Sequence, residues 1–226
     1  RETLLFFNAV SFNVTDPVFG RDVGYYIFQR PFLMSLQQYL FNLWIFLTIY
    51  IVGFYTVIFA MTFSNLSFRY LKIDTVLTHN LVNAGVLFVL LALSFPFERE
   101  SFLFQNVVDN IGESFVHVKV WIPYYSVMTV ALPLLVILSF FFFRKGKYKK
   151  AVMTFGVIPF LWIAVMVSSF IVKETVVKPN AFVKESEYIG YNIRMTKKAY
   201  GLENMTVVEN QGELFSDPEY TKDDVE

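Results

Sequence analysis

Apolar residues along the chain gather into long runs that contain no charged side chain. Four such runs lack any Asp, Glu, Lys or Arg, and they cover residues 31–68, 75–97, 120–143 and 151–172. An α-helix rises about 1.5 Å per residue, so about 20 apolar residues cross a hydrocarbon core of about 30 Å. Each of the last three runs therefore predicts one membrane-spanning helix.

The first run is too long for one straight crossing. The polar residues Gln37 and Gln38 lie near its start, which favours an interfacial approach over residues 31–39 followed by a span. Asn65 and Ser67 lie beyond the end of that span. We therefore expect an all-α membrane protein with about four transmembrane helices packed as a bundle, at about 40–63, 76–97, 120–143 and 151–172.

The charges between the runs predict an orientation. Arg69 and Lys72 follow the first span, and five basic residues lie in loop 144–150, whereas loop 98–119 carries four acidic residues against two basic ones. Short cytoplasmic loops are enriched in Lys and Arg. We therefore expect loops 64–75 and 144–150 in the cytoplasm of a multi-pass cell-membrane protein. The N-terminal segment, loop 98–119 and the C-terminal tail would then be extracytoplasmic.

These limits divide the chain into three parts. Residues 1–37 form a juxtamembrane segment, residues 38–173 form the four-helix transmembrane region, and residues 174–226 begin an extracytoplasmic soluble domain.

The last part of the chain, residues 174–226, has no long uncharged run and instead shows a four-residue repeat. Tyr188, Asn192, Thr196 and Tyr200 recur every four residues, which predicts a helix that stops at Gly201. Residues 205–208 indicate a short strand. We therefore expect the start of an α/β segment there.

Composition and motifs exclude several kinds of chemistry. The chain is 55% hydrophobic, has a formal net charge of zero and contains no cysteine, which excludes disulfides, thiolate metal sites and a cysteine nucleophile. It has no H-E-x-x-H, G-x-x-x-x-G-K or G-x-S-x-G motif. His117 and Glu113 are spaced i, i+4 and could hold a metal only with a third ligand from elsewhere; a solvated loop is the simpler interpretation. We expect no catalytic, cofactor-binding or metal-binding residue and no cofactor.

The predicted spans contain no ionisable group except His79 at one edge. Proton relays and ion pathways usually depend on such groups, so these helices do not suggest a pathway. Asn80 and Asn83 lie beside Ala84 and Gly85, which favours close helix–helix contact with amide hydrogen bonds; a solute-binding role is the alternative. Asn42 also brings substantial polarity to the spans.

Prolines and charges at other positions suggest local structure. Pro133 and Pro159 fall inside the third and fourth helices and should kink them; a hinge or a broken-helix site is the alternative. Asp16-Pro17 predicts a solvated turn, and although Asp16 could approach one cation together with Asp22, their spacing matches no calcium loop.

The charged segments at the membrane edges are interpreted in the same way. Residues 98–100, Glu-Arg-Glu, are most simply a charged membrane-edge cap. The main expected role of the basic loop 144–150 is to fix the orientation of the helices in the membrane. It can also bind anionic lipid headgroups.

Two segments resemble a known family. The first is Asp16-Pro17-x-Phe19-Gly20-x-Asp22-x-Gly24-x-Tyr26-x-Phe28-x-x-Pro31-Phe32. The second comprises Pro179-Asn180, Lys184-Glu185, Tyr188-Ile189, Asn192-Ile193, Thr196 and Ala199-Tyr200-Gly201-Leu202. Their order, with four hydrophobic spans between them, is similar to that of uncharacterised protein family 0182. The resemblance covers nearly the whole chain.

The resemblance implies a large prokaryotic membrane protein of which this chain is an internal fragment. Further helices would precede Arg1, and a long extracytoplasmic domain would follow Glu226. It implies no activity, so three functions remain open. The helices anchor and orient the external domain, or they belong to a transporter or channel, or they belong to a membrane-embedded enzyme whose site lies in that domain. The expected partners are the lipid bilayer and further helices of the same protein, and we expect no nucleic acid.

Overall fold

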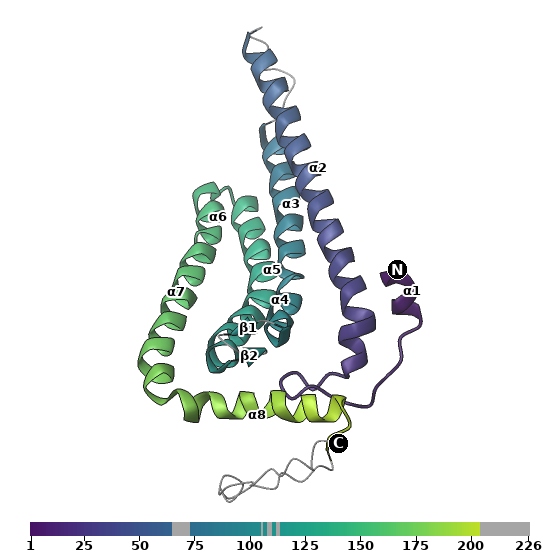
Figure 1. The fold of residues 1–226 in the computed structure, drawn as a ribbon. Helices are drawn as coiled ribbons and strands as arrows, with labels where there is room; N and C mark the ends of the chain where they lie inside the picture. The colour runs from purple at the N-terminus through teal and green to yellow at the C-terminus, as the bar shows by residue number, and fades with distance from the viewer. Residues whose placement is uncertain (65–72, 105, 108–109, 112–113, 204–226) are drawn as a thin grey trace, which may run out of the picture. The chain divides into compact units, whose positions relative to one another are not determined.

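The computed structural model describes residues 1–64, 73–104, 106–107, 110–111 and 114–203, and these residues are mostly helical (Figure 1). Two short strands, β1 (Asn106–Val107) and β2 (Asn110–Ile111), pair antiparallel. The α-helices in these ranges are α1 (Glu2–Phe7), α2 (Arg30–Ser64), α3 (Ile73–Ala92), α4 (Phe95–Ser101), α5 (Ile122–Arg144), α6 (Tyr148–Phe155), α7 (Val157–Val172) and α8 (Ala181–Ala199). Short π-turns and 3-10 turns adjoin them: η1 (Tyr25–Gln29), η2 (Phe102–Phe104), η3 (His117–Trp121), η4 (Lys173–Val177) and η5 (Lys178–Asn180).

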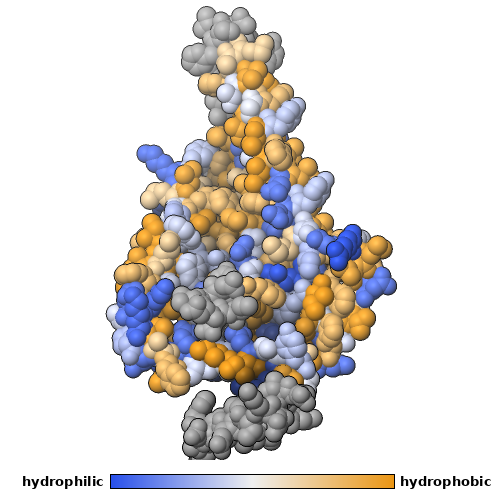
Figure 2. Space-filling model, in the orientation of Figure 1, coloured by the Kyte–Doolittle hydropathy of each residue, from blue (hydrophilic) through white to orange (hydrophobic). Residues whose placement is uncertain are grey.

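Among the described residues, four helical stretches are long and apolar enough to cross a membrane, which confirms the predicted number of long apolar helices. Many of their apolar side chains are exposed, among them Phe46 at 71%, Ile137 at 64% and Phe160 at 69%. Figure 2 shows hydrophobic residues over much of one face of the molecule. Exposed apolar surface costs about 25 cal/mol per Å² in water, whereas lipid accommodates it. The stretches are Tyr25–Met61, Asp74–Phe104, His117–Arg144 and Tyr148–Ala199.

Residues 30–64 form one continuous helix, so the predicted interfacial approach and the first span share a single element. Helix α2 continues unbroken for 35 residues, about 50 Å at the usual rise. The polar residue that suggested a break, Gln37, donates its side-chain amide to the carbonyl oxygen of Leu90 at 3.0 Å. Glutamine is also a good helix former, so its polarity gives the helix no reason to end there.

Polar contacts and a small residue bring α2, α3 and α5 together. The Trp44 indole donates to the carbonyl oxygen of Asn83 at 3.1 Å, and the Asn83 amide donates to the Thr48 hydroxyl at 3.0 Å. On α3, a Cβ placed on Gly85 would lie 3.0 Å from a Val136 methyl group of α5. The packing interpretation of Asn83 and Gly85 is therefore confirmed.

Helix α3 ends before the charged triplet 98–100 because of Pro96. Proline has no N–H to donate to the carbonyl four residues earlier, which is that of Ala92, the last residue of α3. The chain restarts as α4, with Pro96 in the first turn. The triplet therefore lies on a short helix of its own.

A small apolar core lies where α3, α5 and α7 meet. Ala92, Met128 and Leu132 are buried together, and Ile158 and Leu161 of α7 pack against them. Helix α5 continues through Pro133 without a break.

The fourth hydrophobic run is divided by a turn. Helix α6 ends at Phe155, Gly156 is a turn residue, and α7 begins at Val157. Pro159 explains the break, because it cannot donate a hydrogen bond to the carbonyl of Phe155. The buried Ser139 hydroxyl of α5 donates to the carbonyl oxygen of Ala151 at 3.0 Å and attaches α6 to α5.

The predicted α/β segment after the last span is not supported. Its described part, residues 174–203, contains η4, η5 and α8 and no strand, and the predicted strand at 205–208 lies outside the described residues. The helix predicted from the four-residue repeat is α8, and Gly201 follows it with φ of +67°. By its contacts the chain divides into two compact units, 1–189 and 190–226.

Candidate functional site

The juxtamembrane loop before α2 is organised around one buried carboxylate, Asp16. Its Oδ1 accepts the backbone N–H groups of Val18 at 2.9 Å and Phe19 at 2.6 Å. Its Oδ2 accepts the N–H of Arg21 and the hydroxyl of Tyr26, both at 2.8 Å. These four donors fix the carboxylate in place, so the loop folds around it. The interpretation of this segment as a solvated turn is therefore wrong for Asp16, which is 7% exposed.

A second carboxylate, Asp22, closes the base of the same loop. It accepts the Ser11 hydroxyl at 2.6 Å and the N–H groups of Phe12 and Gly24 at 3.1 and 2.7 Å. The Ser11 hydrogen bond lowers the pKa of Asp22, burial opposes this shift, and backbone N–H groups add to it. Because both carboxylates already have protein donors, Asp16 and Asp22 do not form the shared cation site that their sequence allowed.

Two glycines permit this loop. Gly20 has φ of +65°, a conformation that costs a residue with a Cβ about 1 kcal/mol or more. Gly24 has ordinary dihedral angles, but a Cβ there would lie 2.2 Å from the carbonyl oxygen of Val10. Both glycines of the motif are therefore explained by backbone geometry.

The loop and the start of α2 meet α4 at Glu100, whose side chain is almost completely buried. Arg30 Nε lies 3.2 Å from Glu100 Oε2, and the Tyr25 hydroxyl donates to the same oxygen at 3.3 Å. Arg21 Nη1 lies 3.0 Å from Oε1, an ion-pair distance without hydrogen-bond alignment. We call these four residues the Glu100 cluster.

Arg30 also holds the end of α4 through its second nitrogen. Its Nη2 donates to the carbonyl oxygen of Phe97 at 2.9 Å and to the Ser101 hydroxyl at 2.8 Å. Its guanidinium lies 5.3 Å from the ring centre of Phe104. The neighbouring Arg99 turns away and donates to the Ser126 hydroxyl of α5 at 3.2 Å. Interpreting residues 98–100 as a simple charged cap is therefore wrong for Glu100 and incomplete for Arg99.

The Glu100 cluster is suited to holding segments together, not to acid–base chemistry. A buried carboxylate paired with two guanidinium groups has no solvent-accessible face for a substrate, and breaking such a pair is costly. The cluster joins the loop, the first residue of α2 and the end of α4, which are about 70 positions apart in the sequence.

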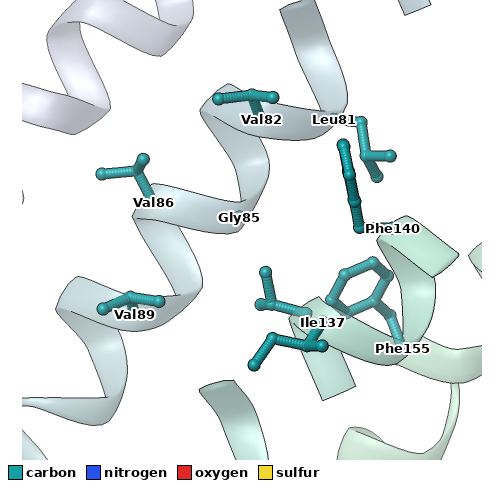
Figure 3. Close-up of a pocket in the computed structure, with 9 residues that line it drawn as sticks. Leu81, Val82, Gly85, Val86, Val89, Ile137, Phe140 and Phe155 are labelled. Carbon is teal, nitrogen blue, oxygen red and sulfur yellow. The ribbon is translucent and has the colours of Figure 1, made fainter. Parts of the chain in front are cut away.

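None of the described residues that line the cavity between α3 and α5 has an ionisable or nucleophilic side chain. It has a volume of about 380 Å³, and apolar residues of α3, α5 and α6 line it. Figure 3 shows the side chains of Ile137, Phe140 and Phe155 beside Gly85 of α3. A cavity of this composition suits an acyl chain or another helix.

The remaining residues singled out from the sequence do not converge. His79 Nδ1 lies 2.7 Å from the Tyr55 hydroxyl, and Asn80 donates to Val76 of its own helix at 2.9 Å. The His117 ring stacks on Phe102 with 4.3 Å between ring centres.

Glu113, suggested as a second metal ligand beside His117, lies outside the described residues. Among the residues the structure does describe, no group of three or more His, Asp or Glu could hold a metal ion.

Comparison with known proteins places the chain in a family. The model of an uncharacterised protein family, UPF0182, matches residues 1–225. The chain belongs to the UPF0182 family. Members of this family include a UPF0182 protein of Caldicellulosiruptor saccharolyticus, 32% identical over 89% of the chain, one of Clostridium perfringens, 28% identical over 91%, and one of Clostridium botulinum, 27% identical over 90%.

The chain spans 22–24% of the length of these UPF0182 relatives, so it corresponds to a part of them. No solved structure matches it. In this family member, the first motif behind the resemblance forms the Asp16 loop and the start of α2, and the second forms η5 and α8.

Sequence reasoning missed the pairing of Arg30 with Glu100. One signal could have found it. Arg30 directly precedes the first uncharged run and the triplet 98–100 directly follows the second, so opposite charges lie at the same predicted membrane edge. Charges at a low-dielectric boundary gain most from pairing.

Proposed function

We propose that this chain anchors the protein in the cell membrane and fixes the orientation of a large extracytoplasmic domain supplied by the remaining sequence. The observation that carries the proposal is the Glu100 cluster. It joins the segment before the first span to the segment after the second span, so two helices are locked together at their outer ends. A rigid outer end is what an attached domain requires for a fixed orientation.

A second contact extends this outer end toward the last helix. The backbone N–H of Phe115 lies 3.1 Å from a carboxylate oxygen of Glu185, in the second turn of α8, and Lys184 lies 5.3 Å from the Phe115 ring centre. On η3, the Trp121 indole donates to the Ser169 hydroxyl of α7 at 3.0 Å. The chain therefore leaves the last span attached to its neighbours.

The uncharged interiors of the four spans also support an anchor. The runs 31–68, 75–97, 120–143 and 151–172 contain no carboxylate, lysine or arginine, whereas transporters usually place such groups along their pathway. In this proposal the spans contact lipid and further helices of the same protein. The basic loop 144–150 faces the cytoplasm and binds anionic headgroups.

The orientation can be tested first, because the chain contains no cysteine. Single substitutions Lys147→Cys and Asn180→Cys place one thiol at each predicted side of the membrane. An impermeant maleimide added to intact cells should label Cys only in the Asn180→Cys variant. Labelling of the Lys147→Cys variant from outside would contradict the orientation.

The anchoring role is tested by exchanging the spans. In the intact protein, residues 40–63, 76–97, 120–143 and 151–172 are replaced by unrelated transmembrane helices, while the outer segments 11–39, 98–119 and 173–203 are kept. If the spans serve only as an anchor, the chimera should restore any phenotype that deletion of the gene produces. Failure to rescue, despite correct labelling topology and a protease-resistant external domain, would show that the spans themselves act on a substrate.

A further inference from the structure

A second cavity lies at the end of the helices where α4 is found, between α4, α5 and α7. Its volume is about 490 Å³, within the range of about 300–1,000 Å³ typical of small-molecule sites. Four aromatic residues and one carboxylate line it: Phe95, Tyr124, Tyr125, Trp162 and Glu98. We call it the aromatic cavity.

The aromatic rings come from three helices and face a shared space. Phe95 and Tyr125 lie with their ring centres 5.6 Å apart, and Tyr124 and Tyr125 lie 5.5 Å apart. Trp162 approaches from α7, in the turn after Pro159, and its side chain is half exposed. The helix break before α7 therefore sets where the indole lies.

Glu98 is the single charged residue in the lining, and it has no cationic partner among the described residues. Its two neighbours on α4 are both engaged: Arg99 donates to Ser126, and Glu100 pairs with Arg30. The three charged side chains of residues 98–100 therefore lie in three different surroundings. Only that of Glu98 is a cavity.

Aromatic rings beside a carboxylate are the surroundings that bind organic ammonium groups. The negative faces of Trp and Tyr attract a cation, more strongly when it is partly desolvated. A carboxylate adds attraction and excludes anions. The floor of the cavity is apolar, formed by Leu91, Met128 and Ile158, and suits a hydrocarbon segment.

We propose that the aromatic cavity binds an amphiphile with an ammonium head. The ammonium lies against Tyr124, Tyr125 and Trp162 and pairs with Glu98, while the apolar part lies along the floor. The same chemistry is offered by a phospholipid with an ethanolamine headgroup and by a water-soluble organic cation of the choline type. This inference concerns a ligand and stands independently of the anchoring role.

The soluble source is tested with choline and its uncharged isostere, 3,3-dimethylbutan-1-ol, on the intact protein in nanodiscs made only of phosphatidylglycerol. Binding is measured by titration calorimetry. Choline should bind and the alcohol should bind much more weakly. The lipid source is tested by adding phosphatidylethanolamine and counting bound lipids by native mass spectrometry, with phosphatidylglycerol as the competitor.

Two variants with matched controls connect the binding to this cavity. Glu98→Gln should weaken ammonium binding about fivefold, as expected for one exposed ion pair, and Trp162→Leu about tenfold, as expected for one cation–π contact. Glu174→Gln, which removes a carboxylate outside the cavity, and Phe170→Leu, which removes an exposed ring of α7, should leave it unchanged. Glu98 is exposed, so its substitution leaves folding intact.

The outcomes separate the alternatives. Choline binding that Glu98→Gln weakens identifies a soluble cation site, and selective retention of phosphatidylethanolamine that both variants lose identifies a lipid site. Equal binding of choline and the alcohol, together with no preference between the two lipids, overturns the proposal. It is equally overturned when both variants bind ammonium probes like the wild-type protein.

Discussion

Burial of the Glu100 cluster predicts that its two arginines contribute very differently to stability. Both guanidinium groups lie about 3 Å from the carboxylate, at 3.2 Å for Arg30 and 3.0 Å for Arg21. Their side chains are 11% and 40% exposed, respectively. Distance alone predicts similar losses, whereas burial predicts a large loss for Arg30 and a small one for Arg21.

The magnitudes follow from the surroundings of each arginine. Removing one partner of a buried ion pair costs about 3–5 kcal/mol, and Arg30→Gln also removes the hydrogen bonds to Phe97 and Ser101. We therefore expect Arg30→Gln to lower the free energy of local unfolding by about 3 kcal/mol. Arg21→Gln should lower it by less than about 1 kcal/mol, because water screens a pair that is more than a third exposed.

Hydrogen exchange of the intact protein in nanodiscs measures this difference. The amides of residues 11–30 should exchange on the order of 100-fold faster in Arg30→Gln, since about 1.4 kcal/mol corresponds to a factor of ten. In Arg21→Gln the increase should stay below about fivefold. Glu100→Gln should resemble Arg30→Gln, because it leaves the arginine buried without its counter-ion.

Equal acceleration in the two arginine variants would refute the reasoning, since it would mean that burial does not govern the strength of these pairs. A double-mutant cycle between Arg30→Gln and Glu100→Gln gives an independent check. The two losses should be strongly non-additive, because either change alone disrupts the same contact.

Three further predictions concern the glycines and the second carboxylate. Gly24→Ala should open the juxtamembrane loop and accelerate its hydrogen exchange, because the new Cβ would collide with the Val10 carbonyl oxygen. Gly85→Leu should lower the thermal midpoint in detergent, because α3 and α5 touch at this position. The pKa of Asp22 is lowered in the folded loop. Its contribution to loop stability is therefore fully present above the unfolded pKa of 3.8 and is lost as the pH falls through the folded pKa. Ser11→Ala removes a hydrogen bond that lowers this pKa, so it should reduce the pH dependence of hydrogen exchange in the loop.

Matched changes control for these effects. Gly53→Ala, at a helical position with open space around the new Cβ, should leave loop exchange unchanged and should not lower the thermal midpoint, because alanine favours the helix more than glycine does. A Gly24→Ala protein with wild-type loop exchange would contradict the assigned contact. A loop that keeps the same acid sensitivity after Ser11→Ala would show that another group titrates.

The helices were predictable because their signal is local. A run of about 20 uncharged apolar residues predicts a span wherever it lies, and each of the four runs lies in a long helical stretch, the last of them divided at Gly156. The continuity of α2 was missed because the polar residue Gln37 suggests a membrane edge, although glutamine is a good helix former; its contact with Leu90 of α3 is the part that the sequence does not reveal. The break at Gly156 could have been placed from Pro159, whose missing N–H affects the carbonyl four positions earlier.

The candidate sites were less predictable because they depend on pairing across long sequence separations. Asp16 looked like a turn residue, and its sequence does not reveal that Tyr26 would donate to it. Glu98, Arg99 and Glu100 are consecutive and look equivalent in sequence. They differ in the direction that each side chain takes from α4. Glu98 lines a cavity, Arg99 contacts α5, and Glu100 forms a buried ion pair.

The burial of Glu100 has a consequence for how the protein matures. Arg30 and Arg21 are synthesised 70 and 79 residues before the carboxylate that they pair with. Until α4 has been made and has met the waiting loop, Arg21 and Arg30 lack the carboxylate that they pair with. The loop and α4 should therefore become stable only together, and a chain that stops before α4 should expose two unpaired arginines.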